Sequence, residues 1–139
     1  MILDETDKPI FEATTHSIRV SVQPLYLEEQ SQPDNGHFVW AYIVNVANEG
    51  MESVQLLNRH WIITDASGHT IEVRGEGVVG EQPVLEPGDC YEYTSGTPLK
   101  TAHGLMKGNY EMKPIEGDPF WVEIPTFALD GPAEMTLLN

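Results

Sequence analysis

Short stretches rich in β-branched and aromatic residues recur along the chain, and most of them alternate apolar with polar positions. This period of two is typical of strands in a half-buried sheet. Clusters of Pro, Gly, Asn and Asp separate the stretches, which suits antiparallel hairpins. The pattern predicts seven strands, at residues 17–22, 38–46, 54–64, 70–73, 90–94, 109–112 and 120–124.

Several features favour a sandwich of two sheets. No window of about 11 residues keeps a helical apolar stripe free of Gly or Pro, so no helix is available to cover a parallel sheet. Tyr110 follows a Gly-Asn pair and is placed to return its hydroxyl to upstream backbone, as in the tyrosine corner of immunoglobulin-like sandwiches. The second stretch is apolar on both faces, as in a central strand, and one face carries Phe38, Trp40, Tyr42, Val44 and Val46.

We therefore predict an all-β, immunoglobulin-like antiparallel β-sandwich of about seven to eight strands over residues 13–129. Residues 1–12 and 130–139 lack the pattern, so we expect a flexible N-terminal segment and a C-terminal tail. A chain of 139 residues has the size of one domain. No apolar run approaches the ~20 residues of a membrane-spanning helix, and the acidic N-terminus does not resemble a secretory signal.

The chain is strongly acidic, with 22 acidic and seven basic residues and a net charge of −15. Such a field opposes approach to a phosphate backbone or an anionic membrane, so we expect neither nucleic-acid binding nor membrane insertion. The single cysteine, Cys90, cannot form an internal disulfide, which fits a reducing compartment. We expect a cytoplasmic protein.

A glycine string, RGEGVVGEQP at residues 74–83, contains the GxGxxG spacing of dinucleotide-binding loops. Those loops open a helix, whereas two valines and Pro83 follow here, so we reject a dinucleotide-binding fold. Gly75, Gly77 and Gly80 still permit a tight loop whose exposed amides cradle an anion. The alternative is a loop shaped for its own packing.

Arg59 is a second candidate ligand-binding residue. Strand alternation places it on the same face as Trp61, so an inward Trp61 implies an inward guanidinium, unless a bulge near Asn58 shifts the register. A buried guanidinium needs an anionic partner. Glu76 or Glu81 of the glycine loop is one source, and a bound phosphate-like ligand is the other.

No set of residues suggests catalysis or a resident metal. The five histidines lie in separate segments without metal-ligand spacing, and no calcium-type DxDxDG loop is present. Cys90 has acidic and aromatic neighbours and is expected to be structural, and Ser95 lacks a GxSxG elbow. We predict a protein that is not an enzyme and has no cofactor, apart from Mg²⁺ carried in with an anionic ligand.

Four motifs in order, at residues 58–65, 74–83, 93–96 and 108–112, resemble the ApaG family over residues 13–129. The resemblance implies a fibronectin type III-like sandwich and a link to cobalt resistance and magnesium efflux. Related domains accompany F-box and polymerase-associated proteins in eukaryotes, which implies protein contacts. Pyrophosphate binding proposed for the family's glycine loop would fall on Gly75, Gly77 and Gly80, to which we add Arg59.

Two functions follow as expectations. The first is a non-enzymatic interaction module in divalent-cation (Co²⁺/Mg²⁺) homeostasis, acting through an unidentified protein partner. The alternative is binding of pyrophosphate or a nucleotide polyphosphate at residues 75–80 together with Arg59. A phosphohydrolase has the least support. Uncovered edge strands would also allow a homodimer.

Overall fold

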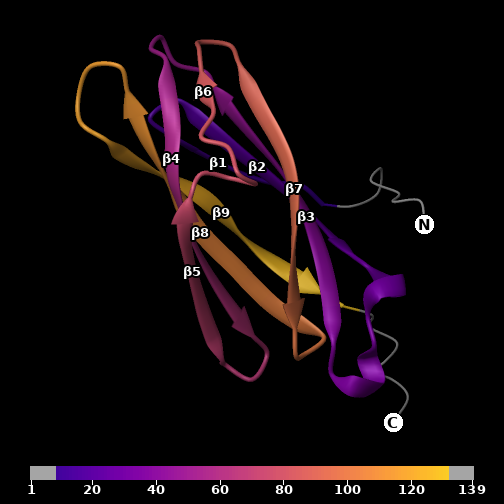
Figure 1. Cartoon of the computed structure of the whole chain (residues 1–139). Helices are drawn as coiled ribbons and strands as arrows, with labels where there is room; N and C mark the ends of the chain where they lie inside the picture. Colours follow the sequence, from indigo (N-terminus) through magenta and orange to yellow (C-terminus); the bar gives the residue numbers. More distant parts are fainter. Residues whose placement is uncertain (1–8, 132–139) are drawn as a thin grey trace.

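The computed structural model describes residues 9–131 and shows nine strands in that range, with two short 3-10 helices between β2 and β3 (Figure 1). The strands are β1 (Phe11–Thr15), β2 (Ile18–Tyr26), β3 (Phe38–Asn48), β4 (Val54–Asp65), β5 (Thr70–Glu76), β6 (Val84–Leu85), β7 (Cys90–Leu99), β8 (His103–Pro114) and β9 (Phe120–Asp130). The 3-10 helices are η1 (Glu28–Gln30) and η2 (Pro33–Asn35).

The strands form two antiparallel sheets, which confirms the predicted β-sandwich. The first sheet has the order β1-β2-β3-β7 and the second β5-β4-β8-β9, with β6 also paired to β4. β1 and the two-residue β6 are additional to the seven predicted strands. β1 begins at Phe11, so residues 11 and 12 of the expected flexible segment belong to a sheet. Residues 1–8 and 132–139 lie outside the described residues.

β8 and β9 extend well beyond the predicted segments 109–112 and 120–124, and β8 runs through Gly104 and Gly108. A Cβ at Gly104 would lie 2.7 Å from the carbonyl oxygen of Thr64, and one at Gly108 would lie 2.1 Å from that of His60. Both glycines allow β8 to approach β4 closely. They extend the strand instead of ending it.

The core lies between the sheets, and β3 is a central strand as predicted. The second sheet contributes Trp61 and Phe127, whose rings lie 5.3 and 6.4 Å from that of Tyr42. β9 lies against β1 and β2, which leaves β5 and β7 as the edges of the opposite side. The inward face of β3 is at most 6% exposed at Phe38, Trp40, Tyr42, Val44 and Val46.

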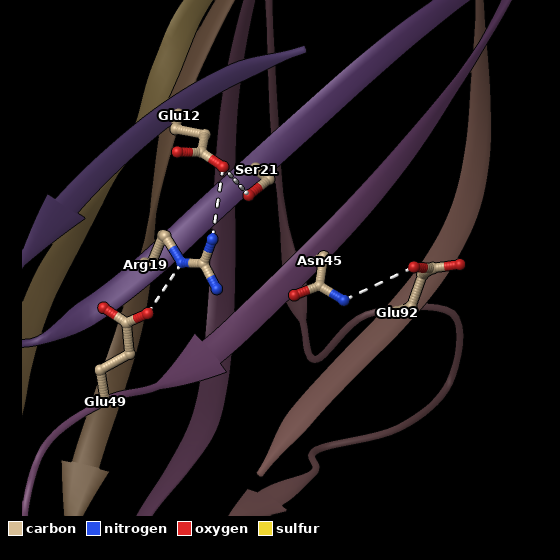
Figure 2. A network of polar contacts seen from close by, with 6 residues as sticks. All are labelled: Glu12, Arg19, Ser21, Asn45, Glu49 and Glu92. Atoms are coloured by element: carbon tan, nitrogen blue, oxygen red, sulfur yellow. Dashed lines mark hydrogen bonds and ion pairs between the residues drawn. The ribbon is translucent and has the colours of Figure 1, made fainter. Parts of the chain in front are cut away.

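The outer face of the first sheet is polar. Figure 2 shows Arg19 between the carboxylates of Glu12 and Glu49, with nitrogen–oxygen distances of 3.4 and 2.9 Å. Asn45 donates a hydrogen bond of 3.5 Å to Glu92 across β3 and β7. Arg19 and these two carboxylates are 39–50% exposed, so water screens each pair, which adds at most ~1 kcal/mol. This face is a solvated surface whose arginine is already paired.

Candidate functional site

The glycine string at residues 75–80 ends β5 in a tight hairpin turn. Val78 and Glu81 exchange two backbone hydrogen bonds, of 2.8 and 2.9 Å. Between them, Val79 and Gly80 both have positive φ, 42° and 83°. Positive φ at both central positions is the mark of a type I′ turn. The string therefore builds a two-residue hairpin, and the helix that a dinucleotide site needs does not follow it.

Arg59 of β4 reaches this turn from inside the sandwich. It lies directly opposite Tyr110 of β8 and two residues from buried Trp61, so the predicted inward direction is confirmed. Its Nη1 donates hydrogen bonds of 2.9 Å to the main-chain carbonyls of Glu76 and Gly77. Main-chain oxygens of the loop, which neither sequence-based alternative included, are thus partners of the guanidinium.

Gly75 provides the space in which the Arg59 guanidinium lies. A Cβ at Gly75 would be 2.7 Å from Cζ and Nη2 of Arg59. The bulge that the sequence left open does occur, because the register of β4 and β8 shifts between Leu56 and Asn58. It precedes Arg59, so the alternation from Asn58 onward is intact. Gly75 has a packing role here that is separate from its predicted role as an amide donor.

Beside Arg59 lies a cluster of buried tyrosines from three strands, Tyr42, Tyr93 and Tyr110, that the sequence did not indicate. The hydroxyls of Tyr93 and Tyr110 hydrogen-bond to each other across the two sheets. The Tyr110 hydroxyl therefore bonds a side chain, whereas a tyrosine corner would bond it to upstream backbone. Burial raises the pKa of all three phenols, and the nearby charge of Arg59 offsets only part of that rise. The phenols stay protonated at neutral pH and supply no general base.

Some main-chain amides of the loop donate hydrogen bonds within the fold, and others have no hydrogen-bond partner. The Gly77 amide donates to the Leu57 carbonyl at 2.8 Å, so one of the three predicted amide donors is already engaged. Gly80 faces open space, with no atom within 4 Å of its Cβ position. Across residues 9–131, the amides of Val79 and Gly80 have no hydrogen-bond partner. Only these two amides at the tip of the turn face outward.

Val79 is the side chain that the loop presents to solvent. It is 55% exposed, between the exposed residues Glu76 and Glu81. Positive φ in a β-branched residue is an outlier that costs about 1–3 kcal/mol. Sequence reasoning did not single out Val79, because Val-Gly is not one of the dipeptides that signal a two-residue hairpin turn.

The remaining polar candidates make small groups of ion pairs, in which the Glu72 carboxylate also lies 3.3 Å from the Arg74 guanidinium. His60 Nε2 lies 2.8 Å from a Glu72 oxygen, and His103 Nδ1 lies 3.5 Å from Asp130. Within the described range, no group of three or more His, Cys, Asp or Glu side chains is placed to hold a metal. Cys90 is exposed at the first residue of β7. No helix in residues 9–131 is long and apolar enough to cross a bilayer.

Comparison with known proteins identifies the family. A family model described as the ApaG domain matches residues 28–114, which include all of β3 to β8 together with Arg59 and the glycine loop. The chain belongs to the ApaG family. The resemblance read from the four motifs is confirmed.

Similar proteins of the ApaG family cover nearly the whole chain. Two relatives named Protein ApaG, from Paramagnetospirillum magneticum and Parvibaculum lavamentivorans, are 57% and 55% identical over 130 residues, 94% of this chain and all of each relative. A crystal structure described as an ApaA protein from Bordetella pertussis has a TM-score of 0.82 at 46% identity, over 87% of this chain and 98% of that one. None of these names states a reaction or a ligand.

Proposed function

We propose that the chain is a non-enzymatic binding module that acts in Co²⁺/Mg²⁺ homeostasis through contact with another protein. The glycine loop, residues 75–81, is the contact surface, with Val79 at its centre. This proposal rests on which main-chain groups of the loop are bonded inside the fold and which side chain points outward. The carbonyls of Glu76 and Gly77, the amide of Gly77 and the main-chain groups that join Val78 to Glu81 are bonded inside the fold, whereas the apolar side chain of Val79 points outward.

The energetics of the turn support a contact outside the fold. A type I′ turn favours Asn at its first central position, and Val there adds strain without adding buried area. Glu76 and Glu81 flank Val79 and are exposed. The loop therefore fits a protein surface that offers an apolar pocket with a basic rim.

Val79→Asn tests the proposal because it removes the apolar contact and relieves the strain. Cross-linked affinity capture from the protein's own cells should recover a partner with the wild type and lose it with Val79→Asn. Val84→Asn is the matched control, because Val84 is 56% exposed but lies in β6. Retention of the same partner by folded Val79→Asn would show that the loop is not the contact.

A second candidate function is binding of pyrophosphate or a nucleotide polyphosphate at the same loop. The open amides of Val79 and Gly80, with Arg59 beneath them, favour it. The net charge of −15 opposes it, so Mg²⁺ would accompany the anion. In an amide NMR titration with pyrophosphate, with and without Mg²⁺, the amide signal of Gly80 should shift first. The Val79→Asn variant should still bind pyrophosphate. Unmoved signals of Gly75, Gly77 and Gly80 would eliminate this candidate.

A further inference from the structure

β5 is an open edge strand. It pairs with β4 on one side, and among the described residues no strand pairs with its other side (Figure 1). Residues 70–74 are all exposed, and two of them, Ile71 and Val73, are apolar and 49% and 37% exposed. An exposed, partly apolar edge is a template for pairing with another strand.

The hydrogen bonds at the two ends of the β4–β5 hairpin show which β5 residues face outward. The amide of Asp65 donates to the carbonyl of His69, and that of Gly77 to Leu57. Bonded pairs alternate along an antiparallel ladder, so odd-numbered β5 residues bond β4. The main-chain groups of Glu72 and Arg74 therefore point to the free edge.

The side chains of β5 are self-complementary in one antiparallel register. When two copies pair about Val73, Glu72 of each copy lies opposite Arg74 of the other, and both residues point their main-chain groups at the partner. Sliding the strands by two residues puts Glu72 opposite Glu72 or Arg74 opposite Arg74, which is repulsive. Sliding by one residue mismatches the backbone groups.

We propose that β5 is a homodimer interface, in which two copies pair antiparallel about Val73 to make one continuous eight-stranded sheet from the two β5-β4-β8-β9 sheets. Four main-chain hydrogen bonds join Glu72 and Arg74 of each copy to Arg74 and Glu72 of the other. On the inner side, Val73 packs on Val73 of the other copy, and Ile71 lies opposite Gly75 of the other copy. This goes beyond the proposed function, because it uses the edge of β5 and not Val79.

Charge reversal tests the register. Sedimentation equilibrium measures the dimer dissociation constant. At ~0.15 M ionic strength the Debye length is about 8 Å, so the salt screens the repulsion between two copies of charge −15. Glu72→Arg and Arg74→Glu should each raise the dimer dissociation constant at least about tenfold, because two attractive pairs become repulsive. Mixing the two variants, or combining both changes in one chain, should restore dimers. A wild type that stays monomeric at millimolar concentration, or variants that do not recover on mixing, would overturn the proposal.

Cysteine cross-linking gives a second readout that tolerates changes in stability. In a Cys90→Ser background, Val73→Cys places two thiols in a non-bonded pair with Cα atoms roughly 4.5 Å apart, within disulfide range. Ile71→Cys is the control on the same face, with its two copies about 13 Å apart in this register. Mild oxidation should cross-link the first variant and leave the second monomeric. Equal cross-linking of both, or of neither, contradicts pairing about Val73.

Discussion

The hydroxyl pair of Tyr93 and Tyr110 joins the two sheets at the base of the candidate site. Tyr110 is fully buried and Tyr93 is 8% exposed, and each hydroxyl is the other's hydrogen-bond partner. We expect Tyr110→Phe to leave the Tyr93 hydroxyl buried without a partner, and Tyr93→Phe to do the same to Tyr110. The double substitution removes both polar groups together.

The expected losses of unfolding free energy follow from the cost of burying a hydroxyl without a hydrogen-bond partner. A buried hydroxyl without a partner costs about 1–3 kcal/mol, whereas removing both members of a pair is nearly neutral. Each single variant should therefore lose about 1–3 kcal/mol of unfolding free energy. The double variant should lose about 1 kcal/mol or less, which gives a coupling of at least about 1 kcal/mol.

Urea unfolding followed by circular dichroism measures all four members of this cycle. Tyr91→Phe is the matched control on β7, because within residues 9–131 its hydroxyl makes no hydrogen bond, and it should change stability by less than about 0.5 kcal/mol. Additive losses in the double variant would refute the reasoning, since they would mean that the hydroxyls are satisfied independently.

Three further predictions concern the glycine loop and Asp65, which lies at the opposite end of the β4–β5 hairpin. Gly77→Ala should lose more than about 2 kcal/mol in urea unfolding, because φ is +63° and the new Cβ would lie 2.1 Å from the Glu81 carbonyl oxygen. Gly75→Ala should lose about 1–2 kcal/mol and move the Arg59 side-chain NMR signals, because it displaces the guanidinium from two carbonyls. The hydrogen bond from the Ser67 hydroxyl holds the pKa of Asp65 below its ordinary 3.8. The stabilisation by the ionised Asp65 carboxylate is therefore complete at neutral pH and is lost as pH falls below about 4. Asp65→Asn should flatten the acid limb of a curve of unfolding free energy against pH.

The alternation of side chains was enough to predict the sandwich. It placed β3 at the centre of a sheet and turned Trp61 and Arg59 inward, because period two records which side chains leave water along each strand. It failed at Gly104 and Gly108, where glycine serves a close approach to β4. That role depends on a neighbouring strand that is distant in sequence, because Gly104 pairs with Asp65 and Gly108 pairs with Trp61, 39 and 47 residues away.

At the candidate site, too, the sequence indicated some features and only the folded structure showed the others. The sequence indicated the glycine loop and an inward arginine, since both are local features. Only the folded structure shows that Arg59 binds the loop carbonyls, that Gly75 makes room for it and that Val79 points outward. These facts depend on how β4 and β5 pair and on which amides are already bonded. Periodicity carries no information about such partners, because they are set by contacts between strands and not by the order of residues within one.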